Sequence, residues 1–328
     1  NDGGSYQPTR SQSLNADATE LPLINGKIVA TSEQCIIFKN LQINVDAGQP
    51  GFDMNNLQVC ENCYTWTGDM GFKANDNDHR KIKLLHCFAK DMTNSGVRLY
   101  NKHHLIDDFY SCTSGAVSMD YYISLYGGTD GHSQCVRNST VDRNINATHT
   151  GHGIGFKGSG GILEHSLVEN CSINNCGNGG FEFRHSTIKH NIGRNITIDS
   201  DTKGVNNRAI MFRDGTSFNR VENSHVNNAE YSVRFLDSTE DGGLNQNGGS
   251  DNTVINTIFS NADTSFINVD GGVTLPNERN KFINCTFDNA PDFYKSGTTP
   301  DYFDSSNEFI NCIVNDCNDK IGSGQGSF

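Results

Sequence analysis

The chain has 328 residues, and its 38 acidic and 25 basic side chains give a formal net charge of −13. Proteins that grip nucleic-acid phosphates usually present a basic surface, so we expect no nucleic-acid partner. Mean hydropathy is −0.55, and no stretch approaches the roughly 18 apolar residues of a membrane span, so we expect no membrane partner either. The sequence begins NDGGSYQPTR without an apolar leader, and we expect a mature protein that is secreted or extracellular.

A repeat runs through most of the chain, after a polar and glycine-rich segment at residues 1–20 that we interpret as a tail or end cap. Segments that read apolar, polar, Asn and then a small residue recur at intervals of 22 to 33 residues. Such a period is typical of a solenoid in which each repeat forms one coil. The recurrent positions are Asn40, Asn62, His86, Ser111, Asn138, Asn170, Asn195, Asn223, Asn256, Asn284 and Asn311.

Two features within the repeats predict β-strands. A second motif in each repeat, such as GFKAND or GFEFRH, alternates apolar and variable residues with period two, which indicates a strand with one buried face. Positions 51 to 275 contain no proline, as a stack of strands paired on both sides requires.

A column of small residues follows the Asn column, and we expect stacked interior thiols there. A five-residue spacing, in Cys171 with Cys176 and in Cys312 with Cys317, could instead close a small disulfide bridge. The members of the column are Cys63, Cys87, Cys112, Ser139, Cys171, Ser224, Thr257, Cys285 and Cys312.

Asparagines stacked at one turn of successive coils can bond to one another and to the turn backbone, at about 1 kcal/mol net for each bond. The column therefore predicts an Asn ladder. It also predicts that the sequons at Asn138, Asn170, Asn195 and Asn284 are interior turn residues rather than glycan sites. Asn146 lies in an apparent insertion, where a glycan could be accommodated.

These patterns resemble right-handed parallel β-helix proteins of the pectate lyase kind. The resemblance implies an all-β fold, a single right-handed parallel β-helix of about 11 coils with an Asn ladder and stacked cysteines. We expect the β-helix to span residues 21–320 and residues 321–328 to form a C-terminal tail.

One face of such a β-helix carries a concentration of positive charge. If the apolar residues of each strand motif point inward, the residues between and after them form two outward columns. Lys157, Arg184 and Arg213 follow one another in one column, and Glu182 lies in the other. Because paired strands lie about 4.8 Å apart, we expect three solvent-facing cations within roughly 10 Å.

Aromatic and further polar side chains extend this cationic line. A cationic groove flanked by flat rings suits a linear anionic polysaccharide, such as a polyuronate or a sulfated glycan. The residues predicted to bind this substrate are Lys73, Arg98, Tyr100, Tyr126, His152, His185 and Arg234.

The stretch GHGIGFKGSGG indicates how Lys157 could be used. Its glycines leave the strand without outward bulk, so a sugar residue could lie close to the backbone. Neighbouring arginines lower the pKa of a lysine toward the range of a general base. Lys157 could then remove the proton α to a uronate carboxylate, while Arg184 or Arg213 stabilises the enolate-like intermediate. The glycines concerned are Gly153, Gly155, Gly158 and Gly160.

This stretch, with VENCSINNCGNGGFEFR after it, resembles the lysine-bearing coil of family 9 pectate lyases. The resemblance implies a lyase that uses Lys157 as its base and Ca²⁺ held by aspartates. The preceding coil reads SMDYYISLYGG and offers only Asp120, so calcium there is doubtful and the arginines could replace it. Asp76 and Asp78 could bind calcium elsewhere.

Other functions fit the same scaffold. A uronate epimerase shares the proton abstraction of a lyase. A glycoside hydrolase of a sulfated or acidic polysaccharide would need two carboxylates, which Glu182 with Asp214 or Asp237 could supply. A non-catalytic polysaccharide-binding or fibre-forming β-helix would need none of this chemistry, since a fold by itself implies no enzyme.

Overall fold

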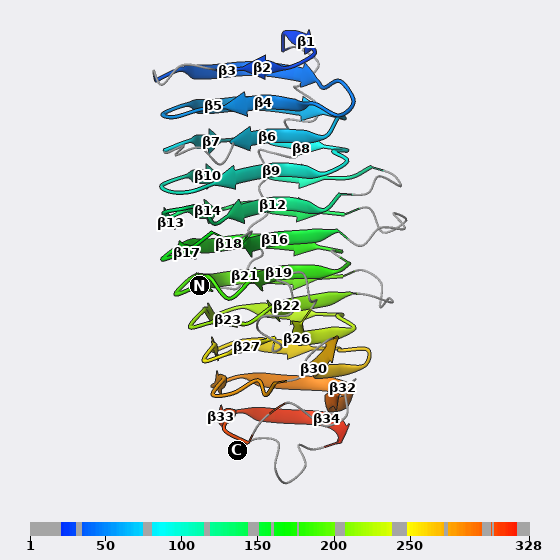
Figure 1. Ribbon diagram of the computed structural model, residues 1–328. Coiled ribbons are helices and arrows are strands. Elements are labelled where there is room, and N and C mark those ends of the chain that lie inside the picture. The colour runs from blue at the N-terminus through cyan, green and yellow to red at the C-terminus, as the bar shows by residue number, and fades with distance from the viewer. Residues whose placement is uncertain are drawn as a thin grey trace.

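The computed structural model describes residues 21–30, 35–74, 81–114, 119–143, 151–158, 161–175, 177–200, 207–237, 248–271, 275–296, 303 and 305–319. Strands and turns make up this part of the chain, with no helix in it. The rungs stack from β1 to β34 (Figure 1). The predicted tails at 1–20 and 321–328 lie outside the described residues, as do Asp76, Asp78 and Asn146.

Successive rungs form three columns of parallel strands, and a strand bonds to its counterparts in the rungs on either side. The first column contains β2 (Ile28–Val29), β4 (Pro50–Met54), β6 (Met70–Ala74), β9 (Ser95–Tyr100), β12 (Tyr121–Tyr126), β16 (His152–Lys157), β19 (Gly179–Arg184), β22 (Arg208–Arg213), β26 (Tyr231–Asp237) and β30 (Ser265–Gly271). The second column contains β7 (Lys83–Leu85), β10 (Leu105–Asp107), β14 (Cys135–Arg137), β24 (Arg220–Glu222), β28 (Thr253–Ile255), β31 (Lys281–Ile283) and β33 (Glu308–Ile310).

The third column contains β1 (Leu23–Asn25), β8 (Phe88–Lys90), β11 (Tyr110–Cys112), β15 (Thr140–Asp142), β25 (His225–Asn227), β29 (Ile258–Ser260) and β34 (Ile313–Asp319). The strands that contribute to two columns are β3 (Ile37–Asn44), β5 (Val59–Trp66), β18 (Leu167–Asn174), β21 (Ile192–Asp199) and β32 (Thr286–Ser296). The end of β34 also reaches the first column, where Asp319 pairs with Asp292 of β32. A smaller parallel sheet contains β13 (Gly131–His132), β17 (Leu163–Glu164), β20 (Ile188–Lys189), β23 (Thr216–Ser217) and β27 (Gly249–Ser250).

Parallel pairing of successive rungs makes the fold a parallel β-helix, as the repeat predicts. The predicted register of the first column is also confirmed. Lys157 pairs with Tyr126 on one side and Arg184 on the other, and Arg184 pairs with Arg213. The site is therefore positioned by backbone hydrogen bonds between rungs.

Inward-facing side chains of the first column form a stack of rings. Phe156, Phe183, Phe212 and Phe235 follow one another at centroid separations of 5.4 Å, with interplanar angles of 25° or less. All four are buried. The period-two alternation of the sequence thus puts one aromatic ring per rung into the core.

The Asn column occupies the turn between the second and third strand columns. Its residues have left-handed φ values of 49° to 54°, a conformation that Asn tolerates better than most residues. Side-chain amides bond across rungs, as in Asn62 Nδ2 to Asn40 Oδ1 at 3.1 Å and Asn195 Nδ2 to Asn170 Oδ1 at 3.0 Å.

Two predictions about this column are wrong. Ser111 lies within β11, and the turn position in its rung is held by Asp108, which contacts His86 Nδ1 at 2.7 Å. Cys112 is displaced with it, since it pairs with Lys90 and Asp142 in the third column. Ser111-Cys112 resembles the repeated pair of a turn residue and a small residue, but it stands three residues after the true turn position at Asp108.

The sequon asparagines are also not interior. Asn195 and Asn284 are exposed, and Asn138 and Asn170 are partly exposed. Their amide nitrogens nevertheless donate to the preceding rung, for example from Asn284 Nδ2 to Asn256 Oδ1 at 3.2 Å. They are outward-facing turn residues, because a left-handed turn at a corner directs its side chain away from the core.

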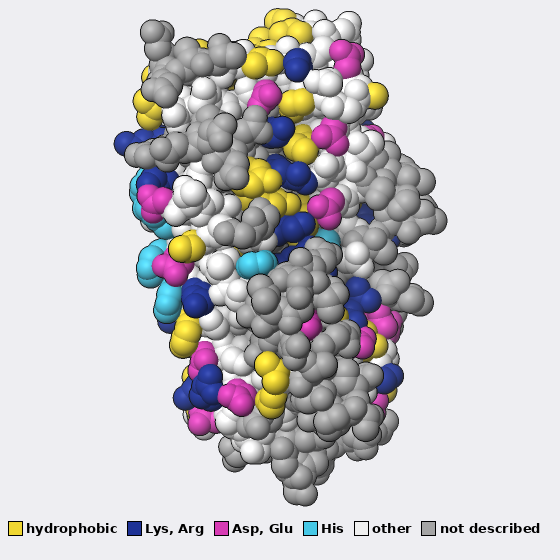
Figure 2. All heavy atoms as spheres, in the orientation of Figure 1, with side chains coloured by type: hydrophobic (Ala, Val, Ile, Leu, Met, Phe, Trp, Pro, Cys, Tyr) yellow, Lys and Arg dark blue, Asp and Glu magenta, His cyan; other side chains and the backbone are white. Residues whose placement is uncertain are grey.

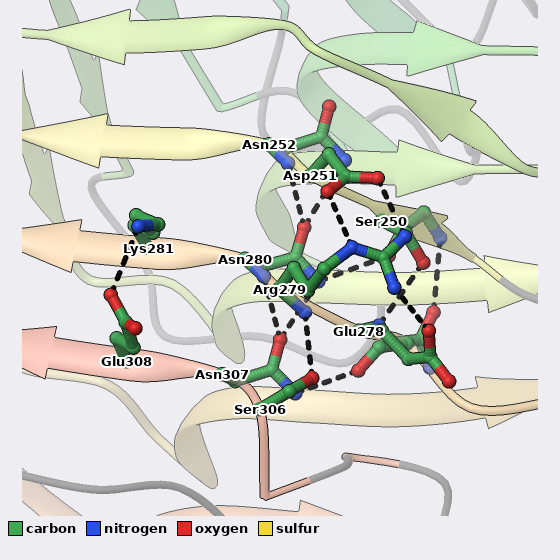
Figure 3. A network of polar contacts seen from close by, with 12 residues as sticks. Ser250, Asp251, Asn252, Glu278, Arg279, Asn280, Lys281, Ser306, Asn307 and Glu308 are labelled. Atoms are coloured by element: carbon green, nitrogen blue, oxygen red, sulfur yellow. Dashed lines mark hydrogen bonds and ion pairs between the residues drawn. The ribbon is translucent and has the colours of Figure 1, made fainter.

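A second, buried ladder lies just before the second strand column, and the sequence analysis missed it. From Asn219 onward, each Oδ1 accepts both the backbone N–H and the side-chain amide of the asparagine one rung earlier, as Asn252 Oδ1 does from Asn219. Figure 3 shows the end of the series in line, beside an exposed Arg279 bound to Asp251 and Glu278. The members are Asn191, Asn219, Asn252, Asn280 and Asn307.

The described cysteines form no disulfide with one another, so the possible bridge between Cys312 and Cys317 is absent, and Cys176 lies outside the described residues. Several thiols donate to a carbonyl of the preceding rung, for example Cys87 Sγ to Cys60 O at 3.3 Å. The expected stack of interior thiols is present at Cys63, Cys87, Cys171 and Cys285, which are buried.

We predict that the two ladders differ in their contribution to stability. Asn252→Ala leaves the buried backbone N–H of Asn219 without its acceptor and removes the donor to Thr216 O, so the free energy of unfolding should fall by about 3 kcal/mol. Asn256→Gly removes an exposed ladder amide but keeps the left-handed turn, and should cost about 1 kcal/mol. Urea denaturation followed by circular dichroism measures both values. Equal losses would contradict the distinction.

Candidate functional site

The candidate site lies on the outward face of the first strand column. Figure 2 shows a line of Lys and Arg side chains, interleaved with hydrophobic ones, along the face where β6, β9, β12 and β16 lie in Figure 1. Acidic side chains lie beside this line (Figure 2). A protein of net charge −13 thus presents a local cationic surface.

Lys157 is at the centre of the accessible part of this face. Its Nζ lies 5.1 Å from the ring centroid of Tyr121 and 5.6 Å from that of Tyr126. The same Nζ and Arg98 Nη2 both lie 3.8 Å from Asp120 Oδ2. The side chains of Lys157 and Arg98 are 17% and 16% exposed, while that of Asp120 is 46% exposed. We call Lys157, Arg98, Asp120, Tyr121 and Tyr126 the Lys157 cluster.

The surroundings of Lys157 favour its neutral amine. Burial lowers the pKa of Lys157 most, the positive charge of Arg184 lowers it further, and the carboxylate of Asp120 opposes both. The net pKa is below the ordinary lysine value. The predicted direction is confirmed, although desolvation is a larger cause than the neighbouring arginine.

Arg184 and Arg213 are buried, which contradicts the expectation that they face solvent. Arg184 Nε lies 3.3 Å from Asp214 Oδ2. Arg213 bridges two carboxylates, with Nη1 3.3 Å from Glu182 Oε1 and Nε 3.4 Å from Asp214 Oδ2. Both arginines keep the predicted register but are neutralised inside the protein. They are therefore not available to bind a substrate carboxylate.

Glu182 is fully buried and anchors a polar network beneath Lys157. Tyr121 Oη donates to Glu182 Oε2, and His152 Nδ1 lies 3.1 Å from the same oxygen. Burial alone would raise the pKa of Glu182, but His152, Arg213 and Arg184 together hold it well below its usual range. Burial, then the charge of Glu182, raises the pKa of Tyr121. Glu182 is thus an ionised internal anion rather than a group that meets substrate.

The glycines around Lys157 make room for protein rather than for a sugar. A Cβ on Gly155 would lie 2.5 Å from Tyr121 Cε1, and one on Gly158 would lie 2.7 Å from Thr187 Oγ1. The ring of Tyr121 stacks on that of His152 at 4.6 Å. The glycine at position 155 therefore lets an aromatic ring support Lys157. Gly160 lies outside the described residues.

The other predicted binding residues are spread along the column. Tyr100 stacks on Tyr126 with centroids 4.6 Å apart, so it extends the Lys157 cluster. Lys73 is half-buried and pairs in register with Arg98 on the next rung. Arg234 lies further along the column and binds Asp270. His185 Nδ1 lies 3.1 Å from Thr187 Oγ1.

Asp120, Tyr121 and Asp214 are the members of the site whose role the sequence analysis missed. The sequence predicts Asp120 only as a calcium ligand, and Asp214 only as a hydrolytic carboxylate. The doublet Tyr121-Tyr122 at the start of a strand, opposite glycines of the next motif, was the signal for Tyr121. Asp214 follows Arg213 directly and has a left-handed φ of 56°, which turns its carboxylate back toward both arginines.

The site does not fit calcium. Asp120 lies 3.8 Å from two cationic nitrogens, and Glu182 is occupied by its internal partners. Across the described ranges of the chain, no group of three or more His, Cys, Asp or Glu side chains is arranged to hold a metal ion. Within those same ranges, no helix is long and apolar enough to span a membrane.

A search with protein-family models finds no match to this sequence, and a search of curated proteins finds none either. Solved structures are similar in fold. The catalytic domain of a GH87 alpha-1,3-glucanase in complex with nigerose matches with a TM-score of 0.65 at 10% identity. The match covers 94% of this chain but only 63% of that one. The A-module of a mannuronan C-5 epimerase from Azotobacter vinelandii matches with a TM-score of 0.53 at 12% identity, covering 97% and 94%.

The fold is thus a right-handed parallel β-helix, as the sequence predicts. Identities near 10% are evidence for the fold alone. The finer resemblance to family 9 pectate lyases stays a prediction.

We predict that the buried network contributes far more stability than a comparable exposed ion pair. Glu182→Leu leaves the buried guanidinium of Arg213 with one carboxylate fewer, and should lower the free energy of unfolding by about 3 kcal/mol or more. The matched control is Glu308→Leu, which breaks an exposed pair with Lys281 (Figure 3) and should cost about 0.5 kcal/mol. Urea unfolding measures both. A Glu182 loss as small as that of the control would show that the network is not structural.

Proposed function

We propose that this protein is an enzyme that acts on an anionic polysaccharide by removing the proton α to a uronate carboxylate, with Lys157 as the base. The observation that carries this proposal is the half-buried amine with a lowered pKa, placed beside the accessible Arg98 and Asp120. A general base needs a pKa near the working range and access to the substrate. Among the charged groups of the site, Lys157 combines the two.

Arg98 takes the role that the sequence analysis gave to Arg184 and Arg213. Lys157 Nζ and Arg98 Nη2 lie at equal distance from one oxygen of Asp120, so a carboxylate fits between the two cations. A uronate carboxylate of the substrate can bind there in the same way. It would place its α-carbon next to the amine, and Arg98 would stabilise the negative charge that develops on the carboxylate.

The chemical step balances without any cofactor. Neutral Lys157 takes the proton from C5, and the electron pair moves into the carboxylate as an enolate. In a lyase, the C4–O4 bond then breaks, a C4–C5 double bond forms, and the leaving oxygen takes the proton from the Lys157 ammonium. In an epimerase, a solvent water on the other face gives a proton to C5, the Lys157 ammonium releases its proton to solvent, and no C–O bond breaks. Both reactions require the same base.

The burial of the acidic residues disfavours a hydrolase. Glycosidases need two carboxyl groups that flank the scissile bond. The candidates Glu182, Asp214 and Asp237 are each at most 1% exposed. In addition, Glu182 is held ionised by its neighbours, whereas a general acid needs a raised pKa.

The proposed substrate is a linear polyuronate, and we place the protein outside the cell, where such polymers occur. The mannuronan epimerase with the same fold acts on a substrate of this class, which supports the choice by analogy. The cationic line offers charge to such a chain, and the partly exposed Tyr100, which stacks on the buried Tyr126, offers an aromatic ring beside it.

We predict that Lys157→Met abolishes exchange of the uronate C5 proton. Pectate and alginate oligosaccharides are incubated with the protein in D₂O, and deuterium incorporation at C5 is followed by NMR, together with the ultraviolet absorbance of unsaturated ends. Loss of the base should reduce both signals by about a hundredfold or more. The matched control is Lys83→Met on β7, an exposed lysine outside the site, which should leave both unchanged. Exchange that persists in Lys157→Met would remove this residue from the base role.

A further inference from the structure

A second polar cluster lies three rungs along the first strand column from Lys157. Arg234 on β26 pairs in register with Asn268 on β30, and Asp270 follows two residues later on the same strand. The side chain of Arg234 is 7% exposed, and Asn268 is 2% exposed. We call Arg234, Asn268 and Asp270 the Arg234 cluster. Neighbouring rungs are about 4.8 Å apart, so it lies about 14 Å from Lys157 along the axis.

The Arg234 cluster contains buried polar atoms that the protein does not satisfy. Arg234 Nη2 bonds to Asp270 Oδ2 at 2.6 Å, but Nε and Nη1 are buried and have no hydrogen-bond partner among the described residues. Asn268 Nδ2 donates to Lys295 O at 3.2 Å, while its Oδ1 has no partner in the same part of the chain. Buried donors and acceptors are rarely left unpaired, because each costs about 1–3 kcal/mol.

The charge around the cluster is also suited to an added anion. Arg208, at the start of β22, has a pKa lowered to about 10, mainly by burial and then by the positive charge of Arg234. The carboxylate nearest to Arg234 is that of Asp270, whose side chain is 39% exposed. The carboxylate partner of Arg234 is thus partly exposed to solvent.

We propose that Arg234 and Asn268 bind a second acidic sugar unit of the same polysaccharide, and that its acid group replaces Asp270 as the partner of Arg234. The proposal rests on the function proposed above, and it extends the substrate to a chain with acid groups at both clusters. The acid oxygens accept from Nε and Nη1 of Arg234, while a sugar hydroxyl donates to Asn268 Oδ1.

The combination of unsatisfied atoms selects a sugar rather than a simple anion. Sulfate or acetate accepts hydrogen bonds but donates none, so it would leave Asn268 Oδ1 unpaired. A neutral sugar offers hydroxyl groups but no charge for Arg234. An acidic sugar supplies both. A uronate and a sulfate ester share this chemistry, and the experiment separates them.

The test measures binding without turnover, in the Lys157→Met background, by isothermal titration calorimetry. The ligands are an oligogalacturonate, a sulfated carrageenan oligosaccharide and a neutral alpha-1,3-gluco-oligosaccharide. Arg234→Met should raise the Kd of the preferred acidic ligand at least tenfold. Asp270→Asn removes the internal competitor and should lower that Kd about threefold or more. Arg279→Met, an exposed arginine at a turn (Figure 3), is the matched control and should change nothing.

The Asp270→Asn variant controls for misfolding, because a misfolded protein would not bind the ligand more tightly than the wild type. The sulfated ligand binding more tightly than the uronate would assign the subsite to a sulfate ester, and the reverse to a carboxylate. An unchanged Kd in both variants, or equal affinity for the neutral ligand, would overturn the proposal. If the wild-type protein exchanges the C5 proton but neither variant changes the Kd, the inference about Arg234 is wrong and the proposed reaction stands. If the wild-type protein does not exchange the C5 proton but binding still depends on Arg234, the proposed reaction is wrong and the inference about Arg234 stands.

Discussion

The rung-to-rung hydrogen bonds of the parallel strands are the constraint on which the rest of the structure depends. They hold successive coils in register, so a residue type that recurs once per repeat becomes a continuous column in space. The stacked phenylalanines, the two asparagine ladders and the line Tyr126, Lys157, Arg184 and Arg213 are all results of that register. The register therefore determines which charged side chains lie next to one another in the site.

Register also explains why the cations of the column have different roles. Arg184 and Arg213 receive Glu182 and Asp214 as neighbours and become internal counter-ions. Within the described ranges Lys157 forms no ion pair with a buried carboxylate, and its ion-pair partner is the exposed Asp120. A buried charge is stable only when close partners offset its loss of hydration, as the carboxylates do for the two arginines. Lys157 is partly buried without such a close buried partner among the described residues, so its pKa is lowered. Arg184 thus lowers the pKa of Lys157, while Arg213 serves as an internal counter-ion.

The sequence predicts the fold and the register well, because both depend on periodicity. It could not predict burial on the outward face. The alternation of apolar and polar residues in β16 and β19 predicts which side chains point away from the core. It does not predict that Asp214, after the end of β22, forms an ion pair with Arg184 and helps to bury it. The rung around Asp108 was misaligned because Ser111-Cys112 imitates the repeat pattern. The buried ladder could have been found, since each of its members stands four positions before an asparagine of the outer ladder, from Asn191 and Asn195 to Asn307 and Asn311.

The central claim is that the rung register leaves Lys157 with a pKa below the ordinary lysine value, and a direct titration of its amine tests this claim. The side-chain signal of Lys157, assigned by comparison with Lys157→Met, is followed by NMR against pH in the wild-type protein and in Asp120→Asn. We expect a pKa below the ordinary lysine value of 10.5 in the wild type, and a lower one in Asp120→Asn, because that change removes the carboxylate that favours the charged form. A wild-type pKa at or above 10.5 would contradict the account.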